Sequence, residues 1–221
     1  MSKKAAYFDV DGTLVRGNIV HNYAFFARNP GSLTEAVTRT AGLLASVPLL
    51  FAADLVDRKA FNELFYRNYK GLSEDRLRFL ADEHFSKIMR PNIYSQGLDL
   101  IQQCRAADCS IVLVSGSLNF IIEPLTRYLD VDDWVTNRLE MVDGMATGLL
   151  IRPVFAGAVK SKWIREHAKR NDIDLEQSYA FSDSYSDYPM LSVVGRPTAI
   201  NPDFQLRTAA RSQDWPILQF D

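Results

Sequence analysis

The chain alternates short, uncharged apolar runs with longer amphipathic stretches, and this alternation restricts its fold more than any other feature. Apolar runs that are short and rich in β-branched or aromatic residues are typical of strands buried on both faces of a parallel sheet. The predicted strands are Ala5 to Val10, Ser110 to Val114, Ser178 to Phe181 and Thr198 to Ile200, and the predicted helices are Gly97 to Ala107, Leu118 to Leu129, Lys160 to Arg170 and Tyr188 to Val194. The pattern therefore predicts an α/β fold with a mostly parallel sheet.

Two segments interrupt the alternation. Residues 16–91 are nearly all helical in character, with helix punctuation at Asn29-Pro30-Gly31-Ser32 and at Gly71-Leu72-Ser73-Glu74-Asp75. They predict a helical cap inserted after the first strand, which leaves residues 1–15 and 92–221 to form the core. The second segment, Thr136 to Arg152, contains the hairpin signal Asp143-Gly144 and predicts a small β flap.

Composition narrows the class of protein further. With 221 residues, of which 47% are hydrophobic and 24% charged, the chain can bury one substantial core and a smaller subdomain. The 25 basic and 27 acidic residues nearly cancel and form no long block, which disfavours nucleic acid as a partner. Cys104 and Cys109 are too few for a zinc site or a disulfide scaffold, so we expect buried thiols and a cytoplasmic location.

The most hydrophobic tract, Ala41 to Ala53, contains Ser46 and Pro48 and is shorter than the roughly 20 residues of a spanning helix. It predicts a buried or partner-facing helical hairpin, and it leaves a peripheral membrane contact open. The apolar run near the amino terminus stops at Asp9, far short of the apolar region of a secretion signal.

Three of the predicted strands end in polar clusters. These clusters are Asp9-Val10-Asp11-Gly12-Thr13-Leu14, Ser115-Gly116-Ser117 and Ser182-Asp183-Ser184-Tyr185-Ser186-Asp187. The carboxyl ends of parallel strands share one edge of the sheet, where ligands bind. We therefore expect the clusters to meet at one site.

The residue types of these clusters indicate phosphoryl chemistry with Mg²⁺. Crowded carboxylates repel one another unless a cation offsets them, and Mg²⁺ suits a few carboxylates together with phosphate oxygens. We expect Asp9 and Asp183 to bind the ion through their side chains, Asp11 through its backbone carbonyl, and Asp187 to hold a coordinated water or a neighbouring ligand. Lys160, rather than Lys162, would pair with Asp9 and the incoming phosphate.

Further residues are candidates for binding the substrate. The Ser115 hydroxyl and the backbone at Gly116 could bind phosphoryl oxygens, although Ser115-Gly116-Ser117 alone is also an ordinary turn. Thr13 belongs to the same predicted phosphate site, while Asn18 and Arg67 could line the entrance or simply lie at the surface. We expect His21, His84 and His167 to be structural, because they show no ligand-like spacing.

The cap also carries an aromatic group, which comprises Tyr23, Phe25, Phe26, Phe61, Phe65, Tyr66 and Tyr69. Its members are more typical of a cap core than of a binding surface. With the tract from Ala41 to Ala53 it makes the cap markedly apolar, which suggests the hypothesis of a lipid-like or bulky apolar leaving group.

The sequence from Phe8 to Leu14, FDVDGTL, resembles the first motif of the haloacid dehalogenase-like (HAD) hydrolases. Ser115 resembles the second motif, Lys160 the third, and Asp183 with Asp187 the fourth, in the order of that superfamily. The resemblance implies a doubly wound, Rossmann-like core and an Mg²⁺-dependent phosphatase. In such a phosphatase Asp9 would attack phosphorus to form an aspartyl phosphate, and Asp11 would act as the general acid and base.

Within the superfamily the chain is most similar to subfamily IB, the phosphoserine phosphatase-like group. Asn137-Arg138-Leu139, Gly144 and Thr147-Gly148 resemble its flap. Phosphoserine phosphatases carry an acid where this chain has Asn18 and a second glycine where it has Ser117, so phosphoserine becomes a minority hypothesis. A phosphotransferase or mutase that uses the same intermediate, or a non-catalytic phospho-acceptor module, remains as an alternative.

Overall fold

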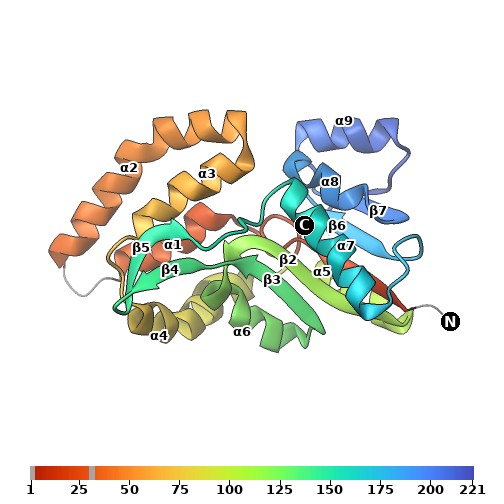
Figure 1. Ribbon diagram of the computed structural model, residues 1–221, viewed down its shortest axis with the longest axis horizontal. Coiled ribbons are helices and arrows are strands. Elements are labelled where there is room, and N and C mark those ends of the chain that lie inside the picture. The colour runs from red at the N-terminus through yellow and green to blue at the C-terminus, as the bar shows by residue number, and fades with distance from the viewer. Residues whose placement is uncertain (1–2, 30–32) are drawn as a thin grey trace.

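The computed structural model describes residues 3–29 and 33–221, and its centre is a six-stranded parallel sheet (Figure 1). The strand order is β3-β2-β1-β6-β7-β8. The strands are β1 (Lys4–Phe8), β2 (Cys109–Leu118), β3 (Asp133–Asn137), β6 (Tyr179–Ser182), β7 (Arg196–Ile200) and β8 (Ile217–Leu218). The predicted α/β fold with a mostly parallel sheet is confirmed, and β1 lies in the middle, between β2 and β6.

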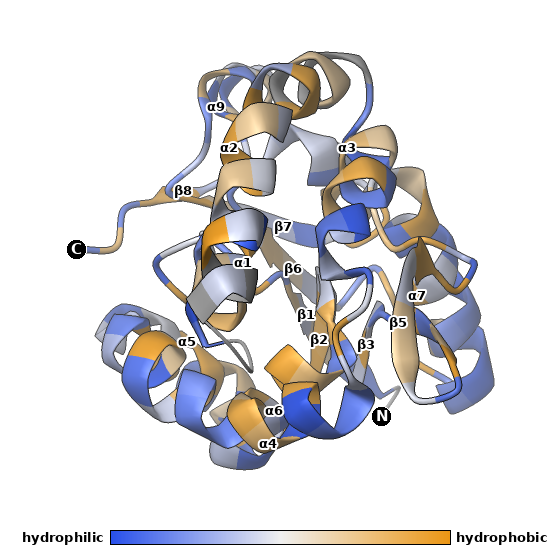
Figure 2. Ribbon diagram, turned by 90° about the vertical axis from the view of Figure 1, so that its left-hand side faces the viewer, coloured by the Kyte–Doolittle hydropathy of each residue, from blue (hydrophilic) through white to orange (hydrophobic). Residues whose placement is uncertain are grey.

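Helices cover both faces of this sheet. Helices α5 (Ser95–Ala106) and α6 (Asn119–Leu129) lie on one side, and α7 (Ala158–Asn171), α8 (Tyr188–Leu191) and α9 (Phe204–Ser212) lie on the other. Side chains of a strand alternate between faces, so Ala6 and Phe8 join the first core while Ala5 and Tyr7 join the second. Figure 2 shows the apolar central strands enclosed by helices whose outer faces are polar. The fold is therefore doubly wound.

Between β1 and α5 the described chain is helical. It contains α1 (Ile19–Arg28), α2 (Leu33–Val56), α3 (Arg58–Phe65), a 3-10 turn η1 (Tyr66–Tyr69), α4 (Glu74–His84), a π-helical turn η2 (Phe85–Met89) and a 3-10 turn η3 (Arg90–Asn92). Val15 pairs with Ile93, and the Tyr94 amide donates to the Leu14 carbonyl at 3.0 Å, so the two ends of this segment lie side by side. The helix start predicted at Pro30 to Ser32 lies outside the described residues.

The tract from Ala41 to Ala53 does not form a hairpin of its own, and this prediction was wrong. It lies within the single helix α2, which contains Pro48 and is bent in Figure 1. A proline inside a helix removes one hydrogen bond and kinks the helix without ending it. Much of the tract is exposed, including Leu44, Val47 and Leu49. In the described part of the chain, no helix has the length and apolar character needed to cross a membrane.

The predicted flap is present as a two-stranded antiparallel hairpin of β4 (Leu139–Val142) and β5 (Met145–Leu150). Its turn residues Asp143 and Gly144 have φ angles of 48° and 72°, the left-handed conformation that an Asp-Gly turn supplies. The hairpin also bonds to the helical segment, because the Gly71 amide donates to the Ala146 carbonyl at 2.8 Å. The strand β3, which precedes the flap, and the two-residue strand β8 were not predicted.

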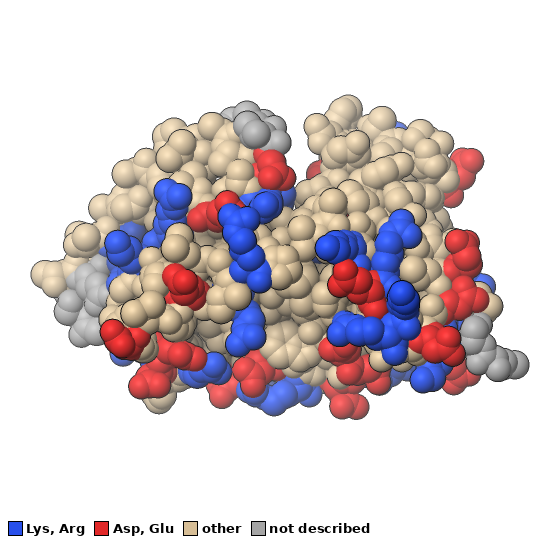
Figure 3. Space-filling view, viewed as in Figure 1, with Lys and Arg blue, Asp and Glu red and all other residues tan. Residues whose placement is uncertain are grey.

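The molecular surface carries both signs of charge. In the view of Figure 3, Lys and Arg side chains are interspersed with Asp and Glu, mainly over the lower half of the molecule. Neither sign forms a continuous patch on this face, and the region of α2 at the upper left is largely uncharged.

Candidate active site

The loop after β1 forms the centre of the candidate site. The Asp9 amide donates to the Phe181 carbonyl of β6 at 3.0 Å, so Asp9 leaves the sheet while still fixed to the neighbouring strand. The loop then turns tightly, with the Gly12 amide donating to the Val15 carbonyl at 2.8 Å. Gly12 has a φ of 87°, a conformation that glycine adopts readily and other residues rarely do. Asp9 and Asp11 are thereby held at the carboxyl edge of the sheet.

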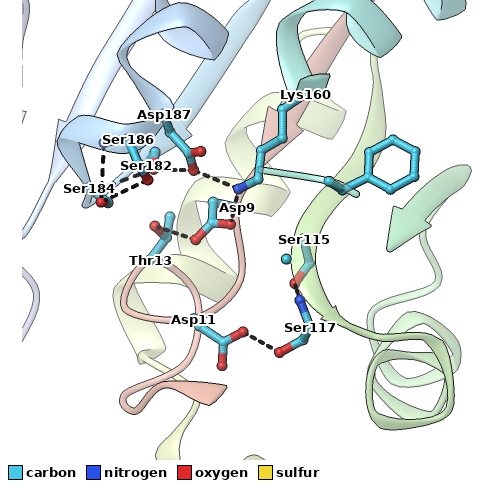
Figure 4. Close-up of polar contacts among 12 residues, drawn as sticks. Asp9, Asp11, Thr13, Ser115, Ser117, Lys160, Ser182, Ser184, Ser186 and Asp187 are labelled. Atoms are coloured by element: carbon cyan, nitrogen blue, oxygen red, sulfur yellow. Dashed lines mark hydrogen bonds and ion pairs between the residues drawn. The ribbon is translucent and has the colours of Figure 1, made fainter. Parts of the chain in front are cut away.

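Lys160, in the first turn of α7, is buried between two carboxylates (Figure 4). Its Nζ donates to Asp9 Oδ1 and to Asp187 Oδ2, each at 2.6 Å. The two carboxylates keep the pKa of the Lys160 ammonium above its ordinary value, although burial acts in the opposite direction. Lys162, the competing candidate, is exposed and lies 3.9 Å from Glu166. The structure therefore brings Lys160, and not Lys162, to Asp9.

Asp183, which follows β6, lies against the same loop. Its Oδ1 accepts from Thr13 Oγ1 at 3.1 Å, and a Cβ added to Gly12 would lie 2.2 Å from its Oδ2. Burial, followed by the charges of Asp9 and Asp187, raises the pKa of Asp183 to about 8. Burial, opposed in part by Lys160, raises the pKa of Asp9 to about 7. The cluster thus holds more negative charge than Lys160 neutralises.

This excess of buried carboxylate charge fits a divalent cation. Among residues 3–29 and 33–221, no three His, Cys, Asp or Glu side chains form a cage that could hold an ion by themselves. Mg²⁺ does not require such a cage, because it usually binds one or two carboxylates and completes its shell with water and substrate phosphate. Asp9 and Asp183 provide two carboxylates of this kind, whereas Asp187 is engaged by Lys160 and by Ser182 Oγ at 2.9 Å.

The second polar cluster differs from its prediction, because β2 does not end at Val114. The strand continues through Leu118, with a shift in its pairing to β3 between Val114 and Leu118. The Ser115 hydroxyl is fully buried and accepts from the Ser117 amide at 3.0 Å. Gly116 lines the central cavity, and its carbonyl accepts from the Tyr66 hydroxyl at 2.9 Å.

Both carboxylate oxygens of Asp11 accept hydrogen bonds. Ser117 Oγ donates to Oδ2 at 2.6 Å, and Asn22 Nδ2 donates to Oδ1 at 3.0 Å. Burial raises the pKa of Asp11, and these two hydrogen bonds oppose the increase. Asn22 was not among the predicted site residues, because nothing in a helical stretch marks one asparagine as a partner of the loop after β1.

Several of these groups line a cavity of about 290 Å³, whereas the predicted phosphate-site residues Thr13 and Ser115 lie behind its lining. It is lined mainly by polar residues, which include Asp9, Asp11, Asn18, Arg58, Asn62, Lys160, Asp183, Asp187 and Asp203. Asn18 reaches this cavity, but its Oδ1 also caps α1 by accepting from the Val20 amide at 3.0 Å. Arg67 is not among the lining residues, because η1 exposes its side chain and sets its backbone against Gly148 of the flap. Arg58, the first residue of α3, occupies the position at the cavity that was predicted for Arg67.

Comparison with known proteins identifies the family. The model of haloacid dehalogenase-like hydrolases matches residues 6–192. The chain belongs to this family. It is 32% identical to a Streptomyces azureus protein that is named for the inhibition of morphological differentiation. This similarity covers 100% of this chain and 79% of that protein. It is also 32% identical to a phosphoserine phosphatase from Mycobacterium tuberculosis, over 98% of this chain and 70% of that enzyme.

The fold is also that of a solved phosphoserine phosphatase, described as a phospho-aspartyl intermediate analogue. The two structures superpose with a TM-score of 0.73 at 18% identity, over 99% of this chain and 94% of the other. The predicted resemblance to HAD hydrolases of the phosphoserine phosphatase type is therefore confirmed, as are the Rossmann-like fold and the enzyme class. The roles of individual residues in this HAD hydrolase stay predictions.

Proposed function

We propose that this HAD hydrolase is an Mg²⁺-dependent phosphatase that hydrolyses a phosphomonoester through an aspartyl phosphate on Asp9. The observation that carries the proposal is the arrangement of Asp9, Asp11, Lys160 and Asp183 around one cavity. Lys160 binds Asp9 Oδ1 at 2.6 Å, whereas Oδ2 has only a long hydrogen bond of 3.5 Å from Thr13 Oγ1, so Oδ2 is the oxygen that can attack phosphorus. The relative described as a phosphoserine phosphatase and the solved aspartyl-phosphate analogue support the same reaction class.

Two displacements at phosphorus make up the reaction. In the first, Asp9 Oδ2 forms a bond to phosphorus while the bond to the leaving oxygen breaks, and Asp11 in its protonated form gives a proton to that oxygen. In the second, water attacks the aspartyl phosphate, Asp11 accepts its proton, and Asp9 leaves as a carboxylate with inorganic phosphate as the product. Lys160, fixed by Asp187, would contribute positive charge beside the transferring group.

Bound Mg²⁺ would offset the carboxylates and the charge on the phosphoryl oxygens. The side chains of Asp9 and Asp183 and the backbone carbonyl of Asp11 would hold it, and Asp187 would act indirectly through Lys160 or a coordinated water. Burial, together with the repulsion among the carboxylates, raises the pKa of Asp9 and of Asp183, and a bound cation would offset both effects.

The lining of the cavity favours a small, polar leaving group. Arg58 and Asn62 reach it from α3, and Arg58 could bind a carboxylate or a second phosphate on the substrate. The aromatic group of the cap instead packs in its interior, where Tyr23, Phe65 and Tyr69 are almost fully buried. The apolar character of the cap therefore gives no support to a lipid-like leaving group in this cavity. We also infer a cytosolic location, in keeping with the unbridged and buried Cys104 and Cys109.

A phosphate-release screen tests the proposal. The panel would contain amino-acid, sugar, nucleotide, lipid and aryl phosphates, each with Mg²⁺ and with a chelator. We expect turnover that requires Mg²⁺ and that falls by at least about a thousandfold in Asp9→Asn. Transfer of the phosphoryl group to an added alcohol would instead indicate a phosphotransferase. A wild-type protein that is inactive on the whole panel, or an Asp9→Asn variant of undiminished activity, would contradict the proposal.

A further inference from the structure

A buried chain of polar side chains lies behind Asp11 and leads away from the cavity into the cap. Asn22 of α1 donates from Nδ2 to Asp11 Oδ1 at 3.0 Å, and its Oδ1 lies 3.2 Å from His84 Nε2. His84 is the last residue of α4 and is completely buried. Asn22 is also buried, so one cap helix places Asn22 against the loop after β1 and a second cap helix places His84 behind Asn22.

The chemistry of these groups determines the direction of each hydrogen bond. Asp11 Oδ1 can only accept, both in the ionised carboxylate and in the acid that carries its proton on Oδ2, so Asn22 must turn its amide nitrogen toward Asp11. Its amide oxygen then faces His84, and this oxygen can only accept as well. His84 must therefore carry a hydrogen on Nε2.

The surroundings of His84 make it a neutral donor. Its ring stacks on Phe26 with centroids 5.3 Å apart and meets Phe25 at 5.3 Å, edge to face. Its Nδ1 has no hydrogen-bond partner in the structure, and burial lowers the pKa of His84 to about 4. A neutral imidazole with its hydrogen on Nε2 leaves Nδ1 as an acceptor. The contacts with Phe25 and Phe26 hold the ring in place, so a donor to Nδ1 is not needed for that purpose.

We propose that His84, through Asn22, positions Asp11 for proton transfer. His84 prevents the Asn22 amide from turning over, because the reversed amide would set its oxygen against the Asp11 carboxylate. Asp11 Oδ1 is thus a fixed acceptor that is bound from the cap, and Oδ2, whose hydrogen bond from Ser117 leaves a second lone pair, is the oxygen that exchanges a proton with the leaving group. His84 and Asn22 are positioning residues, and this role rests on the proposed function of Asp11.

The reactivity of different leaving groups distinguishes this role from simple packing. An aryl phosphate such as 4-nitrophenyl phosphate releases a phenolate, which is stable without a proton. An alkyl phosphate releases an alkoxide, which needs a proton from a general acid. We expect His84→Met to lower kcat/KM by roughly 10- to 100-fold for the alkyl phosphate that the screen finds best. The same variant should change kcat/KM for 4-nitrophenyl phosphate by less than about threefold, because its chemistry does not need the proton.

Two further variants complete the test. His84→Gln keeps a neutral N–H donor near the position of Nε2 and should restore most of the activity toward the alkyl phosphate. Tyr23→Phe is the matched control, since it removes a buried hydrogen bond of 2.9 Å to the Asn68 carbonyl without touching Asp11. It should alter both substrates to the same extent. An equal loss on both substrates in His84→Met would overturn the inference, whereas full activity in Asp9→Asn would overturn the proposed function instead.

A measurement on the unmodified protein keeps the inference testable if His84→Met does not fold. Nitrogen-15 NMR of the histidine rings distinguishes the neutral form with hydrogen on Nε2 from the other tautomer and from the imidazolium. We expect His84 to be neutral with hydrogen on Nε2 at neutral pH. A hydrogen on Nδ1 alone, or a charged ring, would contradict the assigned direction of the hydrogen bonds.

Discussion

Ionisation of Asp9 should make the metal-free protein less stable as the pH rises. The pKa of Asp9 is raised from 3.8 to about 7 in the folded state, mainly because the carboxylate is buried. Below pH 4 the group is protonated in both the folded and the unfolded chain. Between about pH 4 and 7 the unfolded chain releases the proton while the folded protein keeps it, so the free energy of unfolding falls across this window and levels off above pH 7.

The size of this effect follows from the pKa difference. A displacement from 3.8 to about 7 corresponds to about 4 kcal/mol at 1.36 kcal/mol for each pH unit. For a protein of this length, about 4 kcal/mol corresponds to a change in Tm of roughly 8 to 16 °C. Mg²⁺ competes with protons for ionised carboxylates, so the Tm increase that it causes should be larger at pH 8 than at pH 5.

Asp9→Asn removes the ionisation of Asp9 together with the charge that helps to raise the pKa of Asp183, so the variant reports on these two interacting carboxyls. The difference in free energy of unfolding between variant and wild type, measured by urea titration without metal, should therefore change by at least about 4 kcal/mol in favour of the variant from pH 4 to 8. The thermal response to Mg²⁺ should also be reduced in the variant. A difference between the two proteins that is independent of pH would refute the argument.

Three other changes test separate parts of the site. Gly12→Ala places a Cβ 2.2 Å from Asp183 Oδ2 at a φ of 87°, so the Mg²⁺ concentration for half-maximal activity should rise by roughly 10- to 100-fold in a metal titration. Arg58→Ala should lower kcat/KM by roughly 10-fold or more for substrates with an anionic leaving group, whereas Arg67→Ala should leave it within about twofold in the same assay. Lys160→Met leaves two buried carboxylates without their cation and should cost about 3–5 kcal/mol in urea unfolding, part of which Mg²⁺ restores.

Short sequence patterns predicted those parts of the molecule whose conformation depends on neighbouring residues, such as the buried strands and the tight turn of the flap. The strands around Asp9 and Asp183 were recognised because a strand buried on both faces must be continuously apolar, and the polar residues that follow it mark its end. The flap was recognised because Asp143-Gly144 supplies the positive φ angles of a tight turn. The convergence of Asp9 and Asp183 followed from the rule that parallel strands place their carboxyl ends at one edge of the sheet, whereas Lys160 was predicted from its place at the start of a helix and from the resemblance to the third motif.

The residues that the cap contributes to the candidate site could not be predicted from such short patterns. Arg58 of α3 lines the cavity, Asn22 of α1 bonds to Asp11, and His84 of α4 bonds to Asn22. A helical period does not specify which residue of a helix meets a distant loop. Arg67 has the same charge as Arg58 and also lies in the helical segment, yet its side chain is exposed beside the flap. Pro48 indicated a break in the helix, but the chain kinks there and α2 continues.

This chain differs from the phosphoserine phosphatase pattern at Ser117, and the difference affects how the Asp11 carboxyl is held. A glycine at that position would offer no side chain to Asp11, whereas the Ser117 hydroxyl binds Asp11 Oδ2 from the core at 2.6 Å. Asn22 binds Oδ1 from the cap, so the Asp11 carboxyl is held from both parts of the molecule. A displacement of α1 relative to the sheet would move the Oδ1 contact while leaving the Oδ2 contact in place. The geometry of the proposed acid and base thus depends on the position of α1 relative to the sheet.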